Sequence, residues 1–130
     1  MKQLENTITQ ENIKTLMDTF YDAIRKDKDL GPIFHASIGT DAIAWENHKE
    51  KIARFWRQMI LGENVFNGQP LKKHIELPPF PREFFDQWLK LFSVSLSQIY
   101  IPEVANEFLS KAQMIAQRFQ IAMYDMQIQH

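Results

Sequence analysis

The segment Asn67-Gly-Gln-Pro-Leu-Lys-Lys-His74-Ile-Glu-Leu-Pro-Pro-Phe-Pro81 decides the fold, because it holds one histidine between turn and helix-breaking residues. The Asn-Gly pair at its start is a strong turn signal, and prolines close it at its end. A helix rich in aromatic residues, including Trp88, follows at once. A histidine confined in this way has its ring direction set by the fold, as a metal ligand requires. His74 is therefore the first candidate metal ligand.

The bulk composition is that of an ordinary globular chain. Its 130 residues correspond to one domain, residues 1–130. A net charge of −1 gives no electrostatic reason to bind nucleic acid or an anionic membrane. No apolar run reaches the roughly 20 residues of a membrane span, and none near the N-terminus could serve as a signal peptide. We expect a cytoplasmic monomer.

The apolar pattern of the first third is helical. Thr7 and Gln10 match a capping box, and Thr9 is an equally good cap. The stripe that follows has a 3.6-residue period and consists of Ile13, Leu16, Met17, Phe20 and Ile24. Residues 29–32, which contain a Gly-Pro pair, are expected to end this helix. Residues 33–39 are expected to form a short connecting segment.

The remaining pattern is helical as well. Thr40–Asp41 are plausible caps for a second helix that ends at Gly62. Residues 63–70 are expected to form a loop, Pro70 opens a short helix ending near Glu76, and residues 77–81 are extended. Pro81 and Pro102 are each expected to begin a long helix. The predicted fold class is all-α, with about four substantial helices and a short one that carries His74.

The chain contains four histidines. His130 is the last residue and is expected to be frayed, and His35, beside Phe34 in the expected connecting segment, is predicted to be a surface residue. His48 shares a helical face with Trp45, so it points inward or lines a cleft. Judged singly, His48 is an ordinary core histidine and His74 an ordinary solvated one. Tyr21, next to Phe20 on the first helix, and Trp88, on an aromatic stripe, are likewise ordinary core residues when judged alone.

Taken together, these residues resemble a known family. Six segments occur in the order and spacing of the truncated haemoglobins: Phe20-Tyr21, Trp45-Glu-Asn-His48, Phe55-Trp56, Pro70-Leu-Lys-Lys-His74, Leu77-Pro-Pro-Phe80 and Phe85-Asp-Gln-Trp88. The chain is most similar to the third group of that family, the small bacterial single-domain globins. The resemblance runs from about Ile13 to Phe119. The glycine pairs typical of other groups are missing here, which fits the third group.

The resemblance implies a globin-like fold, a truncated two-over-two helical sandwich around haem. It implies that His74 is the proximal iron ligand and that Tyr21, His48 and Trp88 are the distal residues that act on the bound ligand. Since the chain has no cysteine, the haem (iron protoporphyrin IX, haem b) would be held non-covalently. The other expected haem contacts are Phe34, Lys51, Ile52, Phe55, Trp56, Lys73, Phe80, Phe85 and Ile115, with the two lysines near the propionates.

This site implies strong retention of O₂, with NO and CO as further ligands. Tyr21 and Trp88 can both donate hydrogen bonds to a bound ligand that carries negative charge. Slow ligand release suits ligand chemistry or sensing better than oxygen transport. NO dioxygenation or peroxidase-like turnover would need an external reductase, since no flavin or nicotinamide motif is present. His48 is left with three roles: a third donor, a gate, or a second iron ligand.

Two other readings compete with the haem globin. One is a haem-free helical module that binds an apolar ligand or a partner helix through the aromatic face of residues 84–92. The other is a di-iron or zinc four-helix bundle. The second lacks the inward Glu-x-x-His pairs that such sites use, so it is the poorer alternative.

Overall fold

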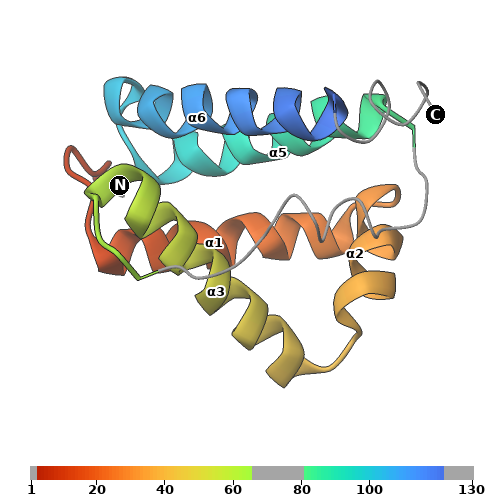
Figure 1. Cartoon of the computed structure of the whole chain (residues 1–130). Helices are drawn as coiled ribbons and strands as arrows, with labels where there is room; N and C mark the ends of the chain where they lie inside the picture. The colour runs from red at the N-terminus through yellow and green to blue at the C-terminus, as the bar shows by residue number, and fades with distance from the viewer. Residues whose placement is uncertain (1–2, 66–80, 122–130) are drawn as a thin grey trace.

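The computed structural model describes residues 3–65 and 81–121 (Figure 1). Its helices are α1 (Gln10–Lys26), α2 (Leu30–Ile38), α3 (Ala42–Leu61), α5 (Glu83–Ile99) and α6 (Pro102–Gln120). Within the described part of the chain, β-type pairing is limited to a single bridge between Glu5 and Tyr100. The predicted all-α class is confirmed. None of the described helices combines the length and the apolar character that crossing a membrane requires.

The helices form two layers. In Figure 1, α5 and α6 run antiparallel in the upper layer, while α1 and α3 cross beneath them. Helix α1 packs against both α3 and α5, so it joins the two layers, and α2 packs on α1 and α3. This is the two-over-two sandwich that the sequence predicted.

Aromatic rings join the layers in the core. Trp56 on α3 stacks on Phe92 of α5, with ring centres 5.4 Å apart and planes 21° apart. Phe92 in turn stacks on Trp88 at 5.5 Å and 16°. Phe20 on α1 meets the edge of both Phe92 and Trp88. Offset and edge-to-face pairs of this kind add to the free energy gained by burying the rings.

Local chemistry sets most helix ends where the sequence predicted them. Thr9, the second of the two expected caps, accepts a hydrogen bond from the backbone N–H of Asn12, and the side-chain oxygen of Asn12 accepts from the N–H of Thr9. Asp41 caps α3 by accepting from Ala44 N–H. Gly62 ends α3 with a φ of 73°, a left-handed conformation that glycine adopts at no steric cost. Pro102 is in the first turn of α6.

The expected connecting segment at residues 33–39 is wrong, because α2 covers most of it. The carboxylate of Asp27 accepts from the N–H groups of Asp29 and Leu30 and so satisfies the start of α2. Pro32 lies in the first turn, where a missing N–H costs nothing. Gly31 is required for space, because a Cβ there would lie 2.9 Å from the carbonyl oxygen of Arg25. The Gly-Pro pair thus belongs to the start of a helix.

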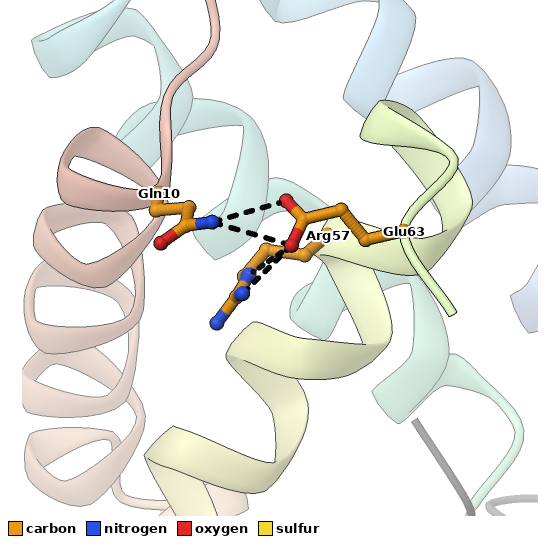
Figure 2. Close-up of polar contacts among 3 residues, drawn as sticks. All are labelled: Gln10, Arg57 and Glu63. Atoms are coloured by element: carbon orange, nitrogen blue, oxygen red, sulfur yellow. Dashed lines mark hydrogen bonds and ion pairs between the residues drawn. The ribbon is translucent and has the colours of Figure 1, made fainter. Parts of the chain in front are cut away.

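A polar cluster joins the start of α1 to the end of α3 (Figure 2) and consists of Gln10, Arg57 and Glu63. Arg57 Nη2 lies 2.7 Å from a carboxylate oxygen of Glu63, just after α3, and Gln10 Nε2 donates to the same group. The hydrogen bond and charge of Arg57 hold the pKa of Glu63 below its usual range against a smaller opposing effect of desolvation. This polar cluster fixes the position of the end of α3 relative to the start of α1.

Candidate functional site

Three helices bring Tyr21, Phe34 and His48 together. The rings of Tyr21 on α1 and His48 on α3 meet edge to face, with centres 4.9 Å apart and planes at 85°. Phe34 on α2 lies 6.2 Å from Tyr21, also edge-on. The inward direction predicted for His48 is therefore observed. We call Tyr21, Phe34 and His48 the distal cluster.

Trp88 approaches the distal cluster from the other layer. The ring of Phe20 contacts both side chains, with its centre 5.0 Å from that of Tyr21 and 5.5 Å from that of Trp88. Trp88 is half-buried, and its lower face is supported by the stack with Phe92. Tyr21 and Trp88 thus both contact the ring of Phe20.

The phenol of Tyr21 lies in an apolar environment. Its side chain is 4% exposed, and this burial raises the pKa of the Tyr21 hydroxyl well above its ordinary value. Tyr21 therefore stays protonated near neutral pH and keeps its O–H as a donor. Nε2 of His48 is also buried. Two polar side chains are thus held among aromatic rings.

Trp45 forms the outer wall of the distal cluster. Its Nε1–H donates to the carbonyl of Gly39 at 2.7 Å, and its ring lies 6.0 Å from Tyr21 and 6.2 Å from His48. The guanidinium of Arg25 lies 4.7 Å above the Trp45 ring, a cation–π contact. Because its indole N–H is already hydrogen-bonded, the Trp45 ring is held in place, and the rings of Tyr21 and His48 pack against it.

The prediction that His35 is a surface residue is wrong. His35 is on α2 with its ring 5.6 Å from Trp45, and its Nε2 is buried. The prediction failed because residues 33–39 were expected to be a connection. A signal was present in the sequence: Leu30, Phe34 and Ile38 recur every four residues, which is helical spacing.

The other predicted haem contacts on α3 differ in how deeply they are buried. Ile52 and Phe55 are partly buried and pack against the main core cluster, and Lys51 is partly buried. Trp56 is only 3% exposed and lies within the core, where it contacts Phe92 and Phe108. Sequence periodicity placed these four on one helix but could not separate the fully buried position from the partly buried ones.

Phe85 and Ile115 belong to a second, smaller cluster of α5 and α6 that also contains Ala116 and Phe119. Lys73, His74 and Phe80 lie outside the described residues, so the predicted proximal ligand is not part of the geometry above. Among residues 3–65 and 81–121, no group of three or more His, Cys, Asp or Glu side chains is placed to hold a metal ion.

The distal cluster fits one face of a haem. A haem pocket needs apolar walls with a few polar groups on the ligand side. Phe20, Phe34 and Trp45 provide the walls, while Tyr21 and His48 provide polar groups within them. A separate groove of about 430 Å³ between α1 and α3 is lined mainly by charged residues and contains neither Tyr21 nor His48.

The two-layer helical fold and the distal cluster define a truncated globin. The chain belongs to the bacterial-like globin family, whose profile matches residues 5–125. Over 118 residues it is 58% identical to the group 3 truncated hemoglobin ctb of Campylobacter jejuni, a match that covers 91% of this chain and 93% of the relative. It is therefore a group 3 truncated haemoglobin, and a haem globin by family.

The solved structures agree with this assignment. The crystal structure of the group III truncated hemoglobin from Campylobacter jejuni superposes on this chain with a TM-score of 0.91 at 56% sequence identity. The match covers 94% of this chain and 96% of that one. The family predicted from the order of the aromatic and histidine motifs is confirmed.

Proposed function

We propose that this globin binds haem b non-covalently and retains O₂ through two hydrogen-bond donors, the Tyr21 hydroxyl and the Trp88 indole N–H. The observation that carries the proposal is the burial of the Tyr21 hydroxyl beside His48 in an aromatic pocket. Haem, when bound, supplies a ferrous iron that takes up O₂, NO or CO and leaves partial negative charge on O₂. The role of His74 as proximal ligand follows from the family pattern.

The donors act on that charge. A hydrogen bond to a charged acceptor contributes roughly 1.5–3 kcal/mol, so two donors slow ligand release by about two to four orders of magnitude. Phe20 presents an apolar ring to both side chains, and Phe34 and Trp45 exclude water from Tyr21. Both effects strengthen a bond to the ligand, because fewer competing partners are available.

Slow release suits chemistry on the ligand better than transport. We infer that O₂ is held for reaction with NO, or that the same donors assist reduction of a peroxide. Either turnover consumes electrons, and the sequence has no flavin or nicotinamide motif, so an external reductase is required. Steady consumption of NO with a reductase present would support an enzyme, and ligand binding without turnover would support a sensor or store.

The first experiment is an optical spectrum of the ferric and the dithionite-reduced protein, with and without CO. A strong Soret band that shifts with CO is expected. His74→Ala should prevent stable haem incorporation, while His130→Ala, which changes the terminal histidine, should leave the spectrum unaltered. A normal proximal-histidine spectrum in His74→Ala would overturn the ligand assignment.

The donor roles are tested by the O₂ dissociation rate in stopped flow. Tyr21→Phe and Trp88→Phe should each raise the rate by about ten- to a hundredfold, since each removes one bond to a charged acceptor. Tyr100→Phe is a matched control, because Tyr100 is a buried tyrosine whose hydroxyl bonds to Asn12 outside the distal cluster. Unchanged rates in both donor variants would refute the scheme.

A further inference from the structure

One carboxylate joins the three helices that carry Tyr21, Phe34 and Trp88. Asp27 is the C-cap of α1, and its Oδ1 accepts from the N–H groups of Asp29 and Leu30 at 2.9 Å each, at the start of α2. Gln87 on α5 donates its Nε2 to both carboxylate oxygens of Asp27 at 2.7 Å. An ionised carboxylate only accepts, so the nitrogen of the Gln87 amide must face Asp27.

This contact lies at one end of the antiparallel α1–α5 pair. At the other end, the Tyr100 hydroxyl donates to Oδ1 of Asn12. The rings of Phe20, Trp88 and Phe92 fill the space between these two polar contacts. Dispersion between rings depends only weakly on a small slide, whereas a hydrogen bond is sensitive to distance and angle. The Asp27–Gln87 contact, at the end of α5 where Trp88 lies, therefore sets the register of the first turns of α5 along α1.

We propose that Asp27 and Gln87 are a positioning pair that holds Trp88 in the register at which its indole and the Tyr21 hydroxyl reach the same ligand. The proposal rests on the donor roles proposed above. Gln87 directly precedes Trp88, so the amide anchors the turn of α5 from which the indole projects. Because Asp27 also caps α2, one carboxylate couples the position of Trp88 to that of Phe34.

The test uses the holoprotein with three variants and a control. Gln87→Leu replaces the amide with an apolar side chain that is one bond shorter. Gln87→Glu places a second carboxylate against Asp27, and combining it with Asp27→Asn lets the new amide at position 27 donate to the new carboxylate at position 87. The control is Gln98→Leu, the same change at an exposed position of the same helix.

Two readouts are needed, the O₂ dissociation rate and the C–O stretching frequency of the ferrous CO complex, which reports the field at the ligand. Gln87→Leu should raise the dissociation rate by about three- to tenfold, since a displaced indole keeps only part of its bond. It should also shift or split the C–O band. Gln87→Glu should behave likewise, the paired variant should recover toward wild type, and Gln98→Leu should match wild type.

A thermodynamic cycle separates positioning from general structural damage. In a Trp88→Phe background there is no indole to position, so Gln87→Leu should change the dissociation rate less than about twofold. An equal effect with and without Trp88 would overturn the proposal, as would wild-type rates and bands in both Gln87 variants. Should Gln87→Leu fail to fold, the Gln87→Glu variant and its rescue by Asp27→Asn carry the same comparison.

The outcomes also distinguish this inference from the function on which it rests. If Tyr21→Phe and Trp88→Phe leave the dissociation rate unchanged, the donor scheme itself fails. If they raise the rate while Gln87→Leu and Gln87→Glu do not, the donors stand and only the positioning role of Asp27 and Gln87 is lost.

Discussion

The hydroxyl group of Tyr100 donates a buried hydrogen bond of 2.7 Å to Oδ1 of Asn12. The same oxygen accepts from the Thr9 N–H at 2.9 Å, and Asn12 Nδ2 donates to the Thr7 carbonyl. The buried amide of Asn12 thus has partners on both of its polar atoms, as a polar group away from water requires. Asn12 therefore links three parts of the chain: the start of α1, the end of α5 and the segment that precedes α1.

Removing either partner should lower stability without changing the ligand chemistry. Tyr100→Phe removes one bond and should cost about 1–2 kcal/mol, while Asn12→Ala removes several and should cost about 2–3 kcal/mol. We expect the thermal midpoint of the holoprotein, followed by circular dichroism, to fall by about 3–5 °C per kcal/mol. In the double variant, Tyr100→Phe should add little to Asn12→Ala.

Asn106→Ala, at an exposed position of α6, is the control for loss of an asparagine amide. It should leave the midpoint within about 1 °C of wild type, because exposed polar groups exchange their bonds with water. Fully additive losses in the double variant of Asn12 and Tyr100 would show that the two side chains do not act through a shared bond.

Substitution of Gly31 should destabilise the protein, because there is no space for a side chain at this position. A Cβ there would lie 2.9 Å from the Arg25 carbonyl oxygen and 3.4 Å from that of Ile24, and neither backbone atom can move without shifting α1. Although alanine favours helix by about 1 kcal/mol over glycine, we expect Gly31→Ala to destabilise the protein by about 1–3 kcal/mol. Haem retention should weaken as well, since α2 carries Phe34.

Substitution of Gly62 should also destabilise the protein, but through backbone strain and not through a steric clash. Its φ of 73° is left-handed and a Cβ there would meet nothing within 4 Å, so Gly62→Ala should cost only about 1 kcal/mol through backbone strain. Thermal midpoints of the two variants measure the difference. A smaller loss at Gly31 than at Gly62 would contradict the steric account.

His35 should tolerate replacement by an apolar ring. Its Nε2 is buried, and no group in the described ranges, 3–65 and 81–121, hydrogen-bonds to that atom. A buried polar atom without a partner costs free energy, so His35→Phe should leave stability unchanged or raise it by up to about 1 kcal/mol. His35→Ala should instead lower it, because the edge contact with Trp45 is lost. A midpoint that falls equally in both variants would contradict this explanation.

The helix ends that the sequence predicted are those governed by neighbouring residues. Thr9, Asp41, Gly62 and Pro102 act on backbone groups within a few positions, so their effect can be recognised in the sequence. Helix α2 carries a helical spacing in the sequence, but its start could not be predicted, because that start depends on the side chain of Asp27 and on the close approach of Gly31 to α1. Both are contacts that only the folded chain reveals.

In the candidate site too, features set by local sequence were predicted, and contacts between distant residues were not. Periodicity predicted that Tyr21 and His48 face inward, and the order of motifs predicted the family, but neither could predict the edge-to-face contact of the two rings. Asp27 and Gln87, 60 positions apart, are both polar residues that a sequence pattern assigns to the surface. Their contact exists only because α1 and α5 run antiparallel.

The two buried tyrosines should make the protein sensitive to alkali. Burial raises the pKa of the hydroxyl of both Tyr21 and Tyr100, and the charge of Glu5 adds to the effect at Tyr100. In the unfolded chain these groups lose their protons near pH 10. Above that pH the unfolded state binds fewer protons than the native state, so stability falls as the pH rises. Each tyrosine should contribute up to about 1.4 kcal/mol per pH unit.

Urea unfolding of the ferric holoprotein at pH 8, 10 and 11 measures this dependence. Stability should be nearly level to about pH 9.5 and then decline, and Tyr21→Phe and Tyr100→Phe should each reduce the slope of the decline. The Tyr21 variant is the more informative of the two. Because its hydroxyl is predicted to stay protonated in the native state, the O₂ dissociation rate of wild type should not rise with tyrosine ionisation up to pH 10. A rate that climbs toward the Tyr21→Phe value between pH 8 and 10 would mean that the hydroxyl ionises in the native pocket, and the raised pKa would be wrong.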